Sequence, residues 1–216
     1  MRTEELIDAL SGDLRPVRRM ASPGRQALGW LGLAVGLVAL CVAAEGLRHD
    51  LAQRMALPAE LGQWVASIAT GVAAAVAAAM LARPDRSAAW VLLPVPPLLA
   101  WLASLGLGCL ADMQRMGPEA MQVGTSWGCF RFILLLGLPL TAAQLWLLRH
   151  AALVRPAPVV VLAGLASAGL CSAGLTLFHH LDAALMVLLW HGGASAMVVL
   201  ASLLLGGPFL ARAAPR

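Results

Sequence analysis

The sequence predicts an all-α membrane protein, a bundle of six transmembrane helices preceded by a short cytoplasmic amphipathic helix at the N-terminus. Of its 216 residues, 60% are hydrophobic and only 12% are charged, whereas about 25% of the residues of a soluble domain are charged. A soluble core of this size has no room for so much apolar surface, so much of the chain must face lipid. Six separate stretches are also long and apolar enough to cross a bilayer.

Each expected span is a window of mostly apolar residues, since about 20 of them cross the hydrocarbon core as a helix. The predicted spans are about 27–45, 61–81, 88–110, 128–148, 157–177 and 184–204. They divide the chain into a cytoplasmic partner-binding segment at 1–26, a transmembrane domain at 27–210 and a cytoplasmic tail at 211–216. The polar, acidic start of the chain is unlike a signal peptide, so the first span is expected to be retained.

Arginine predicts the orientation, because the chain contains no lysine. The N-terminal segment, every second connection and the tail hold ten arginines near the spans, and the alternate connections hold three or four. The positive-inside rule then places both termini in the cytoplasm, with the bundle in a bacterial inner membrane. The ten are Arg15, Arg18, Arg19, Arg25, Arg83, Arg86, Arg149, Arg155, Arg212 and Arg216.

Small residues and prolines predict how the spans pack and bend. Close helix contacts are expected at Gly32, Gly36, Ala73–Ala79, Gly164, Ala168 and Gly169. Local kinks or breaks are expected at Pro94, Pro96, Pro97 and Pro139. The longer connections at 46–60 and 111–127 have room for short interfacial helices.

Several function classes lack their sequence features. There is no P-loop, hydrolase elbow, catalytic carboxylate pair or zinc-protease spacing. The span interiors hold essentially no acidic or basic residue, which disfavours a proton-coupled or ion-coupled carrier. The arginines form no single stripe, so direct nucleic-acid binding is not expected. We therefore expect a protein that is not an enzyme and needs no cofactor.

Thiols and imidazoles gather in the outer halves of the spans. They are Cys41, Cys109, Cys129, Cys171, His49, His179, His180 and His191. For most of the thiols, simple packing is the stronger interpretation. Cys129 follows Trp127 and precedes Arg131, whose charge would favour the thiolate, and an outer thiol can form a disulfide or bind a soft metal.

The outer histidines leave several interpretations open. His179 and His180 end the fifth span, with Asp182 close by, so they either bind a metal together with Cys129, respond to pH, or serve as interfacial polar residues. His191 lies inside the sixth span, where a buried imidazole needs a partner across the bundle or acts in sensing.

The N-terminal segment has an apolar stripe at helical spacing. Thr3 is the expected N-cap, Gly12 weakens the end of the helix and Pro16 stops it. The stripe consists of Leu6, Ile7, Leu10 and Leu14. One such helix cannot bury its stripe alone, and its four acidic residues disfavour an anionic membrane surface. A groove on a protein partner is therefore the favoured place for it.

These residues resemble the NrsF family of six-span membrane anti-sigma factors, which pair with sigma factors of the ECF type. The resemblance covers the whole chain and rests most on residues 5–10 (Glu-Leu-Ile-Asp-Ala-Leu) and 13–19 (Asp-Leu-Arg-Pro-Val-Arg-Arg). It also includes a cysteine at the outer start of span four, here Cys129, a histidine at the outer end of span five, here His179, and an aromatic in span six, here Trp190.

The resemblance implies that the N-terminal segment sequesters a sigma factor, through Leu6, Ile7, Leu10, Leu14, Pro16 and Val17. It also implies release by an oxidant or heavy metal acting at outer cysteines. The family has a second cysteine after the span-five histidine, where this chain has His180, so the disulfide of the family cannot form here. Sensing by Cys129 would then need Cys109, Cys171 or a metal shared with the histidines.

Two other classes of function remain as alternatives. A small transporter or channel would use the proline-broken third span and the outer histidines and cysteines as a path, although acidic residues are missing from the span interiors. A membrane enzyme would use Cys129 as its nucleophile or redox centre, but no base and orienting group accompany it.

Overall fold

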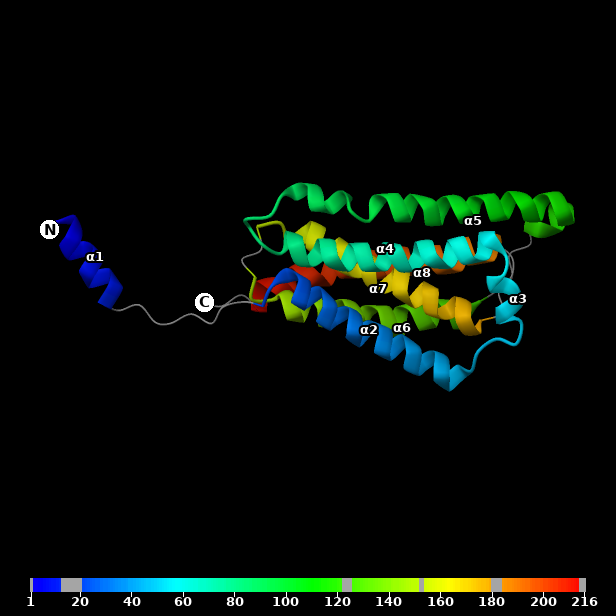
Figure 1. The fold of residues 1–216 in the computed structure, drawn as a ribbon, viewed down its shortest axis with the longest axis horizontal. Helices are drawn as coiled ribbons and strands as arrows, with labels where there is room; N and C mark the ends of the chain where they lie inside the picture. The colour runs from blue at the N-terminus through cyan, green and yellow to red at the C-terminus, as the bar shows by residue number, and fades with distance from the viewer. Residues whose placement is uncertain (1, 13–20, 122–125, 152–153, 180–183, 214–216) are drawn as a thin grey trace.

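The computed structural model describes residues 2–12, 21–121, 126–151, 154–179 and 184–213, and within these ranges every regular element is a helix. The elements are α1 (Thr3–Gly12), α2 (Pro23–Glu45), α3 (Leu51–Met55), α4 (Pro58–Leu81), η1 (Ala88–Leu92), α5 (Val95–Met116), η2 (Gly117–Met121), α6 (Trp127–Leu148), α7 (Pro156–Phe178) and α8 (Ala184–Ala213). Figure 1 shows α2 to α8 as one elongated bundle, with α1 drawn apart from it.

Six helical segments are long and apolar enough to cross a membrane: α2, α4, η1 with α5, α6, α7 and α8. This confirms the predicted all-α fold class with its six spans. Proline at the first turn fixes the start of α2, α4 and α7, where a missing N–H costs no hydrogen bond. The hydroxyl of Ser22 caps α2 by accepting from the Arg25 backbone N–H at 3.3 Å.

The prolines of the third span divide it as predicted. The short 3₁₀ helix η1 ends at Leu92, and α5 begins at Val95, so that Pro96 and Pro97 lie in its first turn. Pro139 lies inside α6. The two longer connections contain the short helices α3 and η2, in agreement with the room expected for them.

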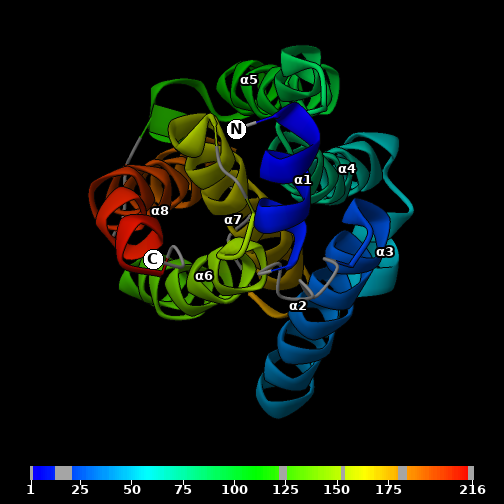
Figure 2. The same ribbon diagram turned by 90° about the vertical axis from the view of Figure 1, so that its left-hand side faces the viewer.

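Helix α7 is the centre of the bundle. Along its apolar window 83% of the residues are buried, whereas the corresponding share is 50% or less in the other five spans. Figure 2 shows α7 surrounded by its neighbours, with the widest contact made to α4. A Cβ built on Gly169 would lie only 3.0 Å from the Ser67 carbonyl oxygen and 3.2 Å from the Gly71 Cα. The small residues expected in α4 and α7 therefore do bring these backbones together.

The expectation for Gly32 and Gly36 is wrong within the single chain. A Cβ at either position would meet nothing within 4 Å, because this side of α2 faces outward. Helix α2 is instead attached by Trp30, whose side chain is fully buried and whose indole N–H donates to the Leu140 carbonyl at 2.9 Å. Large apolar side chains explain this attachment better than glycine spacing does.

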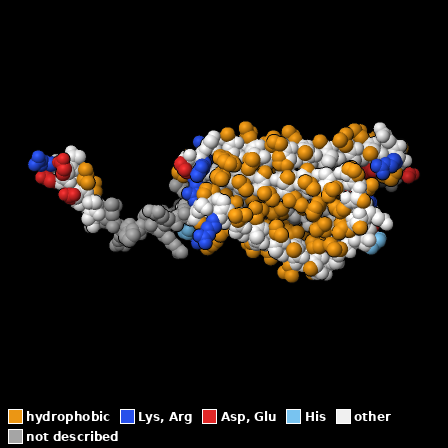
Figure 3. All heavy atoms as spheres, in the orientation of Figure 1, with side chains coloured by type: hydrophobic (Ala, Val, Ile, Leu, Met, Phe, Trp, Pro, Cys, Tyr) orange, Lys and Arg blue, Asp and Glu red, His pale blue; other side chains and the backbone are white. Residues whose placement is uncertain are grey.

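The two ends of the bundle differ from its flank. In Figure 3 hydrophobic side chains cover the visible flank, and charged side chains gather at the ends. Leu28, Leu135 and Leu204, on α2, α6 and α8, are each at least 70% exposed, as suits contact with lipid. We call the end at which α2 begins and α8 ends the terminal end, and the opposite end, which carries α3, the distal end (Figure 1).

Candidate functional site

Helix α1 forms as the sequence predicts, but its cap lies one residue earlier. The Arg2 backbone N–H donates to the Glu5 carboxylate at 2.9 Å, and the Leu6 N–H donates to the Arg2 carbonyl at 3.1 Å. Arg2 therefore takes the N-cap position expected for Thr3, and Glu5 reaches back to it as the third residue of the helix.

The apolar stripe of α1 is uncovered. Leu6 is 42% exposed, Ile7 58% and Leu10 63%, and the helix has no buried residue. Glu4, Glu5 and Asp8 fall on the other side of the helix, because successive residues are turned by about 100°. The remaining predicted partner-binding residues, Leu14, Pro16 and Val17, lie outside the described residues. This amphipathic helix therefore has an apolar face that no other part of the described chain covers.

At the distal end Cys129 lies buried in the first turn of α6. Its sulfur accepts a hydrogen bond from the Ser126 hydroxyl at 3.0 Å, and its side chain is inaccessible to solvent. Arg131 is exposed, and residues two apart on a helix do not face each other. The expected pairing of Cys129 with the Arg131 charge is therefore wrong. All four cysteines are free thiols; Cys171 is buried, and Cys41 and Cys109 are partly buried.

His179 lies against the start of the same helix. It is the C-cap residue that follows Phe178 of α7, and its Nε2 atom lies 3.7 Å from the Cβ that Gly128 would carry. Three aromatic rings close this region: Trp127 and Trp190 have centroids 5.5 Å apart, and Phe130 is 5.9 Å from Trp127. The structure thus brings together His179 and the neighbourhood of Cys129, from two helices far apart in sequence.

His191 lies one helix further on and is 5% exposed. Its Nε2 atom is buried and has no hydrogen-bond partner within the described residues, so the partner expected across the bundle is not found there. His179 and His191 both line a cavity of about 760 Å³ at the distal end, between α4, α5, α7 and α8. His180 lies outside the described residues. Within those that are described, no three His, Cys, Asp or Glu side chains are placed to hold a metal ion.

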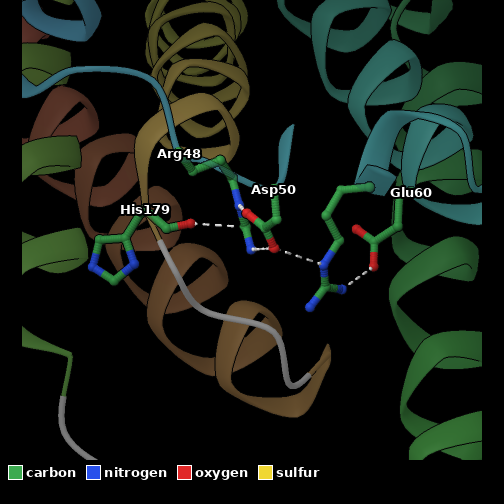
Figure 4. A network of polar contacts seen from close by, with 5 residues as sticks. Arg48, Asp50, Glu60 and His179 are labelled. Atoms are coloured by element: carbon green, nitrogen blue, oxygen red, sulfur yellow. Dashed lines mark hydrogen bonds and ion pairs between the residues drawn. The ribbon is translucent and has the colours of Figure 1, made fainter. Parts of the chain in front are cut away.

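A chain of ionic contacts borders this cavity (Figure 4). The buried Arg48 guanidinium makes two contacts with the Asp50 carboxylate, at 2.6 and 2.8 Å, and donates to the His179 carbonyl at 3.0 Å. Arg54 lies 3.6 Å from Asp50 and 3.0 Å from Glu60. The hydrogen bonds from Arg48 hold the pKa of Asp50 well below its usual range, so this carboxylate is charged at neutral pH.

Sequence reasoning missed Arg48. In the sequence it is one of the few arginines in the connections expected on the outer side, and a loop arginine gives no sign of which backbone it contacts. The spacing of Arg48 and Asp50 was the available signal, yet such a pair is usually a solvated surface contact worth little. Burial and the third contact, to His179, distinguish this one.

The structure defines a class of protein: a six-helix membrane bundle with an uncovered amphipathic helix at one end and a polar, aromatic and thiol cluster at the other. The chain belongs to the NrsF family, described as negative regulator of sigma F, which matches residues 10–212.

Two relatives are similar over most of the chain. One is the anti-sigma-F factor NrsF of Caulobacter vibrioides (strain NA1000 / CB15N), 33% identical over 215 residues that make up 96% of each chain. The other is the probable anti-sigma-F factor NrsF of Azospira oryzae (strain ATCC BAA-33 / DSM 13638 / PS), 31% identical over 176 residues, 76% of this chain and 78% of the relative. No solved structure matches the chain.

Proposed function

We propose that this chain is a membrane-bound anti-sigma factor that sequesters a sigma factor of the ECF type through its N-terminal segment. The single observation that carries the proposal is the uncovered stripe of Leu6, Ile7 and Leu10 on α1, in a chain whose family consists of negative regulators of a sigma factor. An apolar helix face of this kind needs a groove, and a sigma factor held in that groove stays at the membrane. The role is binding, and no step of catalysis is required.

The test of this function is co-purification of the full-length chain with its sigma factor. The sigma factor to use is the one encoded beside the gene, expressed together with the tagged chain and extracted in mild detergent. Retention of the sigma factor on the tagged chain is the expected result. A chain that is folded and membrane-inserted but retains no sigma factor would contradict the proposal.

The proposed location is the bacterial inner membrane, with the terminal end in the cytoplasm. Arg25, Arg83, Arg86, Arg149 and Arg155 support this orientation, because all five lie at the terminal end near the ends of spans. A sigma factor acts in the cytoplasm, so α1 must also lie there for the proposed function.

Reporter fusions test the orientation. A fluorescent protein fused after Arg216 should be bright and alkaline phosphatase at the same place inactive, because the C-terminus is expected in the cytoplasm. Alkaline phosphatase inserted in the connection between the third and fourth spans should be active. The reverse pattern would place α1 on the wrong side of the membrane.

We further propose that the distal end receives a periplasmic signal, an oxidant or a heavy metal, which leads to release of the sigma factor. Support comes from the position of His179 beside the turn that begins α6, from the adjacent thiol of Cys129 and from the cavity that reaches His191. Thiolates and imidazoles are ligands for soft and borderline metals, and the periplasm is an oxidising compartment in which thiols form disulfides. His180 is included as a further candidate ligand.

Cys129→Ser should abolish the response while leaving the sigma factor bound. The hydroxyl retains a hydrogen-bonding group toward Ser126, but it neither oxidises like a thiol nor binds a soft metal. Release of the co-purified sigma factor by diamide or Cd²⁺ should fall to the level seen without either reagent. Cys41→Ser, on α2, is the matched control, because this thiol is assigned no role in sensing, and it should respond as the unchanged chain does. A full response from Cys129→Ser, and from separate His179→Ala and His180→Ala variants, would show that these residues are not the sensor.

A further inference from the structure

The C-terminal end of α7 is capped by a residue from another part of the chain. The last carbonyls of a helix have no N–H partner within the helix. Here the backbone N–H of Arg48 donates to the Leu177 carbonyl at 3.0 Å. The Arg48 guanidinium donates to the carbonyl of His179, the C-cap residue directly after α7. A cation at this end of a helix also interacts favourably with the helix dipole. Arg48 thus supplies both a hydrogen-bonding and an electrostatic cap.

The chain turns toward α7 immediately after α2. Gly46, which follows the last residue of α2, has a φ of +84°, a conformation that side chains with a Cβ rarely adopt. Arg48 comes two residues later, with only 5% of its side chain exposed, and its other face is held by Asp50. The chain just after α2 is therefore joined to α7 by the backbone N–H of Arg48 and by its buried guanidinium, whose three nitrogens each make a contact (Figure 4).

The distal half of α2 is packed less closely against the bundle than the half near the terminal end. A cavity of about 530 Å³ lies between α2, α4 and α7, with Val35, Val42, Trp64 and Leu177 among its apolar lining residues. Nearer the terminal end, α2 is fixed by Trp30 to the Leu140 carbonyl and by the Gln26 amide to the Leu147 carbonyl at 3.2 Å. Figure 2 shows α2 leaning away from the bundle axis. Without Arg48, α2 would keep its attachment near Trp30 and have room to tilt.

We propose that Arg48 is a positioning residue that couples the distal-end site to α2, and so to the segment that binds the sigma factor. His179 is the shared element, because its imidazole lies against the turn beside Cys129 and its carbonyl accepts from Arg48. Oxidation of the thiol, or binding of a metal to the thiol and the imidazole, displaces this carbonyl and releases the guanidinium from it. Helix α2, which directly follows the N-terminal segment in the chain, then tilts. The structure, with its thiols free and this contact made, is the state that holds the sigma factor.

This inference rests on the proposed function, and its test uses the full-length chain co-purified with the sigma factor. Arg48→Met keeps much of the side-chain volume and the backbone N–H that donates to Leu177, but removes the side-chain donors to His179 and Asp50. Retained sigma factor should fall about five- to tenfold without any signal, within the usual range of allosteric coupling. Arg54→Met is the matched control, because it removes a charge from the same network at its contacts with Asp50 and Glu60, and retention should stay near that of the unchanged chain.

His179→Ala separates coupling from general destabilisation. It removes the imidazole and keeps the backbone carbonyl, so the sigma factor should stay bound while diamide and Cd²⁺ lose their effect. If Arg48→Met does not accumulate, Arg48→Lys carries the test, since it keeps a charged donor and loses the paired contact with Asp50; it should retain less sigma factor than the unchanged chain. Retention equal to that of Arg54→Met in the folded variant would overturn the coupling role. An unchanged chain that retains no sigma factor would instead refute the proposed function itself.

Discussion

Leu10→Asp is expected to abolish binding of the sigma factor, with a loss of affinity of at least about 100-fold. The side chain is 63% exposed at the middle of the uncovered stripe on α1, flanked by Leu6 and Ile7. Burying a leucine contributes about 1.5–3 kcal/mol, and a carboxylate in its place adds the cost of desolvating a charge inside an apolar groove. Because about 1.4 kcal/mol corresponds to a factor of ten, the first contribution alone approaches the predicted loss.

The matched control for this prediction is Ala9→Asp. It places the same charge one residue away, and Ala9 lies about 100° around the helix from Leu10. Both variants should accumulate in the membrane and unfold as the unchanged chain does, because no residue of α1 is buried. Quantitative co-purification, followed by titration in detergent, measures the difference. Equal binding by both variants would mean that α1 does not contact the sigma factor through this stripe.

Gly169→Val is expected to cause the largest loss of stability of any single substitution considered. A Cβ at this position would meet the Ser67 carbonyl oxygen and the Gly71 backbone, at 3.0–3.2 Å, and backbone atoms cannot rotate aside as a flexible side chain does. Forcing extra atoms into a packed contact costs about 1–3 kcal/mol, and sometimes more. The apparent Tm of the detergent-solubilised protein should fall by roughly 5–10 °C, from the usual relation between stability and Tm.

Gly36→Val is the control for this crossing of α4 and α7. The same change of residue is made in a membrane-spanning helix, where a Cβ meets nothing within 4 Å. Its apparent Tm should stay within the scatter of the unchanged protein. A loss equal to that of Gly169→Val would show that the outward face of α2 is packed in the assembled protein, for instance against a second copy.

The six spans could be predicted from the sequence because they depend on local composition. A run of about 20 apolar residues crosses a bilayer whatever its neighbours are. Closely spaced prolines also interrupt a helix locally, as Pro94 to Pro97 do between η1 and α5, whereas the single Pro139 stays inside α6. The amphipathic α1 could be predicted for the same reason. Predicting these features requires no information about the contacts that the helices make.

Contacts between elements could be predicted only in part. Gly36 and Gly169 are the same residue in equally apolar spans, yet one faces outward and the other meets a backbone, because the rotation of a helix in the bundle depends on all its neighbours. Arg131 was expected beside Cys129 from closeness in sequence, and helical geometry turns it away. Arg48 is the clearest case, since its partners His179 and Leu177 follow it by about 130 residues and only the fold joins them.

The sequence pattern alone does not predict that the distal-end residues Cys129 and His179 lie close together. Cys129 and His179 have no shared spacing in the sequence, and the structure places them on neighbouring turns of α6 and α7. The resemblance to the NrsF family singles out both, and it implies a second cysteine at the position of His180. What a chain senses without that second thiol is the question that the Cys129→Ser, His179→Ala and His180→Ala variants address.

The central claim, that the stripe on α1 contacts the sigma factor, is tested most directly by photo-crosslinking in intact membranes. A photoreactive amino acid is placed at Ile7, at Leu10 or, as the control, at Asp8 on the other face of the helix, in the full-length chain expressed with its sigma factor. We expect strong crosslinks to the sigma factor from positions 7 and 10 and weak crosslinks or none from position 8. Crosslinks of equal strength from all three positions, or none from 7 and 10 while the sigma factor still co-purifies, would contradict it.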